Sequence, residues 1–323
     1  MAKLIPLKQN TPEWMEFRRG KIGGSGLGGI WQQRAYNAED VRTLLEGRNF
    51  DFDAYLEQLK KENPRKRSVT VDDMKLLLTD EDKEELQSGG DRKIGFYEVL
   101  AEQISIAPQD DEDEAQWRDA RDRGHGLEDA AAQDAAVILG KHVAKVGCIV
   151  AEPEDGDNPE DIPLYDSIYN SPDRIIFPEG IDPVKFLDED GDLIVEVFEQ
   201  DPFDINEQME IKCLKASKHL MAWHTRRIPE DYWTQKVQYF ITNKKLETLY
   251  WVFHNPLVPI MPTFILVVRR EDLGHWPQTL VRYQKRMIRE MNTLKERIIA
   301  ESDQLILPAA PEKGVENVNS TAA

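Results

Sequence analysis

Residues 209–220 read MEIKCLKASKHL, and together with YNSPDRII at 169–176 this stretch decides the fold that the sequence predicts. Successive side chains of a β-strand point to opposite faces of its sheet. In such a strand Glu210 and Lys212 share one face, while Ile211 between them points into the core. The spacing therefore places a carboxylate and an ammonium group side by side.

A second carboxylate comes from the other fragment. Asp173 stands where another strand begins, and it lies beside Glu210 if the two strands pair. Glu128, in a helical pattern, supplies a third carboxylate. Carboxylate oxygens are ligands that Mg²⁺ prefers, and a lysine beside the ion can orient or deprotonate water and stabilise charge that develops on phosphate. The fragments predict a metal-assisted hydrolytic site.

The rest of the chain reads as helices, then mixed strands, then helices, which indicates an α/β or α+β fold with one core. Thr11 and Pro12 have the pattern of a helix start, with Thr11 as the N-cap. Further helices are predicted at 38–62, 94–105, 126–140, 228–243 and 276–302. Predicted strands lie at 144–151, 164–169, 174–177, 209–213 and within 246–270, with a hairpin at 184–199.

We expect a single domain over residues 1–307. Insertions near 63–92 and 178–207 interrupt it, and the first of them reads as one or two short helices. Residues 308–323 are polar and lack periodicity, which predicts a disordered tail.

The net charge of −19, from 60 acidic and 41 basic residues, at first argues against a nucleic-acid partner. However, the segments 110–114, 152–161 and 182–207 together hold 21 acidic residues and one basic residue. The remainder carries 39 acidic and 40 basic residues, a net charge of +1. The acidity is therefore local, and it does not exclude DNA.

Other classes of protein are disfavoured. No stretch has the about 20 apolar residues of a membrane span, and MAKLIPLKQN lacks the apolar segment of a signal peptide. Cys148 and Cys213 are too few for a disulfide framework, a four-cysteine zinc site or an iron–sulfur cluster. The acidic hairpin resembles a calcium loop in spacing, but Leu193 stands where the turn requires Gly. We expect a protein of the cytoplasm.

Four ordered blocks resemble the lambda-exonuclease-like (YqaJ-type) viral recombinase family of the PD-(D/E)xK nuclease superfamily. They are TPEWMEFRRGKIGGSGLGGI at 11–30, RGHGLEDAAAQ at 123–133, the two fragments quoted above, and IPEDYWTQKVQYF at 228–240. The resemblance implies a restriction-endonuclease-like core, in which a central mixed β-sheet is flanked by helices.

The resemblance also implies roles for individual residues. It implies a Mg²⁺ site, with Mn²⁺ as a substitute and two ions in all, whose ligands are Asp173, Glu210, the carbonyl of Ile211 and Glu128. Glu128 would alternatively position water, and Lys212 would activate that water. Gln235 would lie near the site, with Gln238 as the less favoured candidate. Arg18 and Ser25 would hold the 5′-phosphate of a DNA end.

The implied activity is that of a 5′-to-3′ exonuclease on double-stranded DNA with 5′-phosphorylated ends. It would release mononucleotides and leave a 3′ single strand for recombination. The resemblance further implies a single-strand DNA annealing protein as partner, a homo-oligomeric ring trimer, and a phage or mobile-element origin in a bacterial host cell.

Two alternatives stay open at this point. One is an endonuclease or repair nuclease of the same superfamily without end preference, and the other is a non-enzymatic acidic protein that mimics DNA. The sequence departs from the family where Arg174 replaces a Gly and Leu214 replaces a Pro. In addition, 36 residues separate Asp173 from Glu210, so an acid of the intervening hairpin such as Asp192 is a further candidate ligand. The Gly-rich stretch of the first block suits an anion, but it also suits close helix packing.

Overall fold

The computed structural model describes most of the chain. The described residues are 3–31, 38–48, 50–79, 82–83, 86, 92–105, 114–153, 156–177, 179, 184–187, 193–197 and 205–302, without the side chains of 114–125 and of the 184–187 and 193–197 strands. The expected tail at 308–323 and the candidate Asp192 lie outside these residues.

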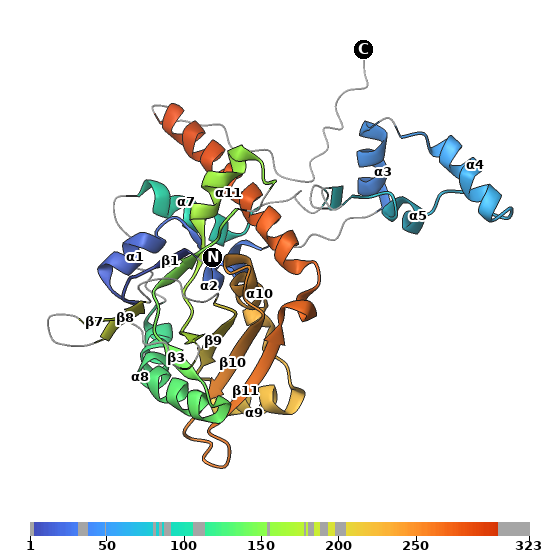
Figure 1. Cartoon of the computed structure of the whole chain (residues 1–323). Coiled ribbons are helices and arrows are strands. Elements are labelled where there is room, and N and C mark those ends of the chain that lie inside the picture. Colours follow the sequence, from blue (N-terminus) through green and yellow to red (C-terminus); the bar gives the residue numbers. More distant parts are fainter. Residues whose placement is uncertain are drawn as a thin grey trace.

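A five-stranded mixed sheet forms the centre of the molecule (Figure 1). Its order is β11 (Thr263–Arg269), β10 (Thr248–His254), β9 (Glu207–Lys212), β6 (Arg174–Phe177) and β3 (His142–Ala144). The β9–β10 pair is parallel, and the other pairs are antiparallel. The predicted central mixed sheet is therefore confirmed.

The two faces of this sheet are covered by different helices. On one face, Met209, Ile211 and Val252 pack against alanines of α8 (Glu114–Leu139). Those alanines are Ala131, Ala132 and Ala135, and their small side chains let the helix lie close to the strands. Because strand side chains alternate, Glu210 and Lys212 point to the opposite face.

The opposite face is covered by the larger core. Leu249, Trp251 and Phe253 of β10 pack there with apolar residues of α10 (Trp233–Thr242) and α11 (Trp276–Ala300). All seven residues of β10 are buried, as in a strand covered on both faces. The helices α2 (Gly24–Ile30) and α7 (Ile94–Ile104) complete this layer.

A smaller four-stranded sheet carries the N-terminal part of the chain. Its order is β1 (Lys3–Ile5), β4 (Cys148–Val150), β5 (Ile168–Asn170) and β2 (Ile22–Gly23). A 3-10 helix at Pro159–Ser167 occupies most of the predicted strand at 164–169, because Asn158 caps a turn that begins at Pro159. That part of the strand prediction is wrong, and β5 begins only at Ile168.

Several local predictions are confirmed. Thr11 accepts a hydrogen bond from the Trp14 amide and caps α1 (Pro12–Arg18). The acidic segment contains the antiparallel hairpin of β7 (Val184–Leu187) and β8 (Leu193–Val197). Other short helices are α9 (Ala216–Thr225) and the 3-10 turns Glu230–Tyr232 and Arg270–Leu273.

The helix predicted at 38–62 is divided into α3 (Ala38–Gly47) and α4 (Phe52–Glu62). Asp51 starts the second helix by accepting hydrogen bonds from two backbone amides. With α5 (Val71–Lys75), these helices surround an apolar cluster of their own, apart from the sheets in Figure 1. Among the described residues, no helix is both long and apolar enough to cross a membrane.

Candidate active site

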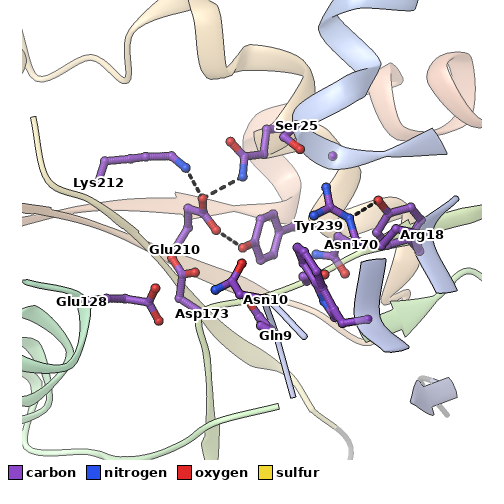
Figure 2. Close-up of a pocket in the computed structure, with 15 residues that line it drawn as sticks. Gln9, Asn10, Arg18, Ser25, Glu128, Asn170, Asp173, Glu210, Lys212 and Tyr239 are labelled. Carbon is purple, nitrogen blue, oxygen red and sulfur yellow. Dashed lines mark hydrogen bonds and ion pairs between the residues drawn. The ribbon is translucent and has the colours of Figure 1, made fainter. Parts of the chain in front are cut away.

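Strand β9 brings Glu210 and Lys212 to a pocket that Gln235 and Tyr239 of α10 also line (Figure 2). Glu210 is 2% exposed, and each of its oxygens has a partner. Lys212 Nζ donates to Glu210 Oε1 at 2.5 Å, and Gln235 Nε2 donates to the same oxygen at 2.7 Å. The Tyr239 hydroxyl donates to Oε2. A buried carboxylate needs such donors, because burial of an unpaired charge is costly.

Asp173 lies beside Glu210 because β6 pairs with β9, with Arg174 opposite Met209. The Ile211 amide donates to Asp173 Oδ2 at 2.6 Å, which fixes the carboxylate against the strand. Burial raises the pKa of Asp173 well above its usual value, and the negative charges of Glu210 and Glu128 raise it further. The three carboxylates therefore repel one another in a confined space.

Glu128 reaches the same place from α8, and its carboxylate points towards Asp173 in Figure 2. It does not stand alone there. Arg174 Nη1 donates to Glu128 Oε1 at 2.9 Å, and the other guanidinium nitrogen pairs with Asp129. The residue that departs from the family pattern thus neutralises one carboxylate of the site.

Lys212 supplies the other positive charge. Burial alone would lower the pKa of Lys212, but the neighbouring Glu210 and Asp173 carboxylates reverse this effect and raise it. Its ammonium group also lies 5.0 Å from the centre of the Tyr232 ring and 5.9 Å from that of the Trp251 ring. Lys212 is therefore held as a cation against Glu210.

The donor set fits a divalent cation in part. Asp173 and Glu210 are two adjacent carboxylates, and a cation between them would relieve the repulsion that raises the pKa of Asp173. Within the described part of the chain, no three His, Cys, Asp or Glu side chains form a metal-binding group. A site here would consequently use a backbone oxygen such as the Ile211 carbonyl, since Glu128 is engaged by Arg174.

The same pocket extends to the first block of the chain. Arg18 and Ser25 line it together with the carboxylates. The Arg18 guanidinium lies 3.9 Å from the centre of the Trp14 ring, and its Nε donates to the Tyr169 hydroxyl at 2.6 Å. This leaves the terminal guanidinium nitrogens as donors for a ligand, and guanidinium groups suit phosphate.

The glycines of the first block serve close packing. A Cβ atom at Gly23 would lie 2.5 Å from the ring of Tyr169, and one at Gly24 would lie 3.3 Å from the Gln235 side chain. Gly23 therefore has no room for a side chain beside β5, and a Cβ atom at Gly24 would require the Gln235 side chain of α10 to shift by a few tenths of an ångström. This contact brings exposed Ser25 to the mouth of the pocket.

The structure separates the two glutamine candidates. Gln235 contacts Glu210 directly. Gln238 is fully buried, and it donates to the carbonyls of Ile22 and Tyr169 and exchanges hydrogen bonds with Gln284. Gln238 consequently ties α10 to its neighbours and does not face the carboxylates.

Sequence reasoning missed several residues of the pocket. Tyr239 follows Gln235 by four positions and Trp14 precedes Arg18 by four, so helical spacing places each pair on one face. This spacing identifies Tyr239 once Gln235 is assigned to the site, and Trp14 once Arg18 is assigned to it. Gln9, Asn10 and Asn170 also line the pocket, but no sequence pattern marks them.

Comparison with known proteins supports the fold. No model of a protein family matches the chain, and no curated protein matches it. Two solved structures of the alkaline exonuclease LHK-Exo from Laribacter hongkongensis, one of them in complex with dAMP, are similar to it. Each has a TM-score of 0.51 and 14% sequence identity, covering 92% of this chain and 100% of the other. The chain thus shares the fold of these exonuclease structures, and its mixed α+β architecture is as predicted.

Proposed function

We propose that this protein is a metal-dependent 5′-to-3′ exonuclease that degrades one strand of duplex DNA from a 5′-phosphorylated end. The observation that carries the proposal is that one pocket is lined by two groups of residues. The first group is Asp173, Glu210 and Lys212, and the second is Arg18 and Ser25. The first group suits phosphodiester hydrolysis, and the second suits a terminal phosphate. The similar fold of an exonuclease agrees with this assignment.

Each residue of the first group has a part in hydrolysis. Asp173, Glu210 and the Ile211 carbonyl would hold Mg²⁺, with Mn²⁺ as a substitute. The bound ion would lower the pKa of water and neutralise charge on the phosphate. Lys212 orients the attacking water and stabilises negative charge in the transition state. Gln235 and Tyr239 hold the Glu210 carboxylate in place through their hydrogen bonds.

Glu128 is assigned to a second ion or to the water. The hydrogen bond between Glu128 and Arg174 favours the positioning of water, because a carboxylate neutralised by a guanidinium group is a weaker ligand for a cation.

The second group accounts for end preference. Arg18 is held by Trp14 and Tyr169, so its fork of donors is oriented before a ligand arrives. A terminal phosphate at Arg18 and Ser25 would align the adjacent phosphodiester bond with Asp173 and Glu210. One similar solved structure holds dAMP, which supports mononucleotides as the product.

A direct test uses linear duplex DNA labelled at either 5′ end and a covalently closed circle, each with Mg²⁺ or with EDTA. We expect mononucleotides from the linear substrate alone, only with Mg²⁺, and a remaining 3′ single strand. Cleavage of the circle would instead identify an endonuclease. No cleavage of either substrate would favour the acidic protein that mimics DNA.

We also propose a recombination setting, in which a single-strand DNA annealing protein takes over the exposed 3′ strand. The family resemblance supports this partner, a ring trimer, a phage or mobile-element origin and a bacterial cytoplasm. Light scattering on the purified chain tests the trimer, and a monomer at micromolar concentration would contradict it.

A further inference from the structure

The helices α3, α4 and α5 form a small unit, here called the helical arm. Its apolar cluster is built around Val41, Leu45, Met74 and Leu78. Figure 1 shows the arm beside the main body, with the loop that follows α4 at its outer end. The first block and the catalytic strands do not contribute to this cluster, so the arm has no part in the pocket.

The outer end of the arm carries a dense group of positive charges. Residues 60–67 read KKENPRKR and hold five basic residues and one acidic residue, in a chain whose net charge is −19. We call this segment the basic tip. Such a group in an acidic protein is a local surface of opposite sign, and it attracts anions whatever the net charge.

Two of the five cations are neutralised within the arm. Lys60 Nζ pairs with Glu57 at 2.7 Å, and Lys66 Nζ pairs with Asp73 at 2.6 Å. Lys61, Arg65 and Arg67 are exposed, and no ion pair within the described part of the chain engages them.

The backbone of the tip has a defined shape. Pro64 follows Asn63 in a turn, where the Lys66 amide donates to the Asn63 carbonyl at 2.9 Å and the Arg65 amide donates to the Asn63 side chain at 3.2 Å. On the other side of the loop, Thr70 and Asp73 form a capping box that starts α5. Lys61, in the last turn of α4, and Arg65 and Arg67, in the loop that follows, are therefore displayed at an ordered end of the arm.

We propose that Lys61, Arg65 and Arg67 contact the phosphate backbone of duplex DNA outside the catalytic pocket. This inference rests on the proposed function, which makes DNA the polyanion that this protein meets. Duplex DNA carries one charge per about 1.7 Å of its axis, so side chains spread over the end of α4 and the following loop can each meet a phosphate. The three side chains are exposed, which suits phosphate contacts that do not depend on base sequence.

A basic surface would increase the DNA affinity of a protein whose net charge is −19. The acidic segments at 110–114, 152–161 and 182–207 repel DNA, and phosphate contacts supply most of the sequence-independent affinity. A basic tip on an arm adds affinity at a distance from the carboxylates, where extra cations would compete with the metal ion.

The test measures binding of a 5′-phosphorylated duplex by fluorescence anisotropy in EDTA, at several salt concentrations. The variant is K61A/R65A/R67A in the full chain. The control with the same change of charge is K3A/R269A/R297A, which removes three exposed cations from the main body, of which Lys3 pairs with Asp166. Circular dichroism confirms that both variants are folded.

We expect the tip variant to bind about tenfold more weakly or worse, with the slope of log K against log salt reduced by roughly 2 to 3. The control should stay within about twofold of the parent. Equal DNA affinity and equal salt slope for the two variants would overturn the inference. That result is also expected if the tip binds an acidic protein and not DNA.

The readout also separates this inference from the proposed function. Binding in EDTA does not require cleavage. If the parent protein cleaves no DNA with Mg²⁺ but the tip variant binds DNA more weakly than the parent, the proposed nuclease activity is refuted and the DNA contact at the tip is retained. If the parent cleaves DNA and the tip variant binds it as tightly as the parent, the nuclease activity is retained and the DNA contact at the tip is refuted.

Discussion

Arg174 Nη1 donates a 2.9 Å hydrogen bond to Glu128 Oε1, so a buried guanidinium group lies directly behind one carboxylate of the candidate active site. It links the start of β6 to the helix that covers the sheet. Its guanidinium group forms an ion pair with Glu128, one of the two carboxylates whose negative charge raises the pKa of Asp173.

Replacement of Arg174 by Met should therefore change both stability and metal binding. We expect a loss of about 2–3 kcal/mol in the free energy of unfolding, because Glu128 loses its partner in a partly buried place. The more negative site should bind Mg²⁺ more tightly. Urea unfolding and the Mg²⁺ midpoint of a thermal-shift titration measure these effects. Arg174→Lys is the control, and an unchanged midpoint in the Met variant would contradict the prediction.

Lys212→Ala should abolish Mg²⁺-dependent cleavage while the protein stays folded. General acid–base groups contribute about 10²–10⁴-fold, so kcat should fall by at least that factor. Single-turnover cleavage of linear duplex DNA measures the change. Lys245→Ala, at an exposed residue of the body, is the matched control. Activity within tenfold of the parent would remove Lys212 from the site.

Arg18→Ala should reduce the preference for 5′-phosphorylated ends over hydroxyl ends. The guanidinium group faces the pocket, whereas that of its neighbour Arg19 donates to the carbonyls of Glu102 and Ser105. Loss of a charge-assisted contact of about 1.5–3 kcal/mol corresponds to a preference reduced by more than tenfold. Arg19→Ala should keep the preference. An equal loss of rate on both kinds of end would argue against the phosphate pocket.

Tyr239→Phe should remove the hydrogen bond that orients the Glu210 carboxylate, while Glu210 itself stays in place as the proposed metal ligand. The lost hydrogen bond is worth about 1–2 kcal/mol, so we expect kcat to fall about tenfold. Because Tyr239 acts through Glu210, the Mg²⁺ concentration at half-maximal rate should rise as well. A fall in kcat at an unchanged Mg²⁺ midpoint would indicate a role unrelated to the ligand.

Asp173→Asn should stabilise the protein in EDTA and destroy its response to Mg²⁺. The pKa of Asp173 is higher in the folded state than in the unfolded chain, so ionisation disfavours folding and stability falls as pH rises through the folded value. The neutral Asn avoids this cost. At pH 8 we expect a melting temperature about 2–4 °C above the parent for each kcal/mol gained. A variant less stable than the parent in EDTA would refute this account.

Much of the site follows from local rules of the sequence. The alternation along β9 places Glu210 and Lys212 on one face, and the structure shows both on the face opposite α8. The pairing of β6 with β9 also follows from the two fragments.

Other features depend on contacts that no local pattern encodes. The sheet of β1, β4, β5 and β2 joins residues from the N-terminus to residues beyond position 148. The bond between Arg174 and Glu128 similarly requires the position of α8 over the sheet. In both cases the tertiary arrangement selects the partner.

The order and direction of the strands determine where new chain termini could be placed in a circular permutant of this protein. The parallel pairing of β9 with β10 requires a crossover, and α10 within that crossover brings Gln235 and Tyr239 over Glu210. New termini placed between β9 and α10 would detach the supporting helix from its strand. The antiparallel pairing of β6 with β9 requires no crossover, so the connection carrying β7 and β8 can vary in length without moving Asp173. A circular permutant opened within that hairpin should therefore retain its active centre.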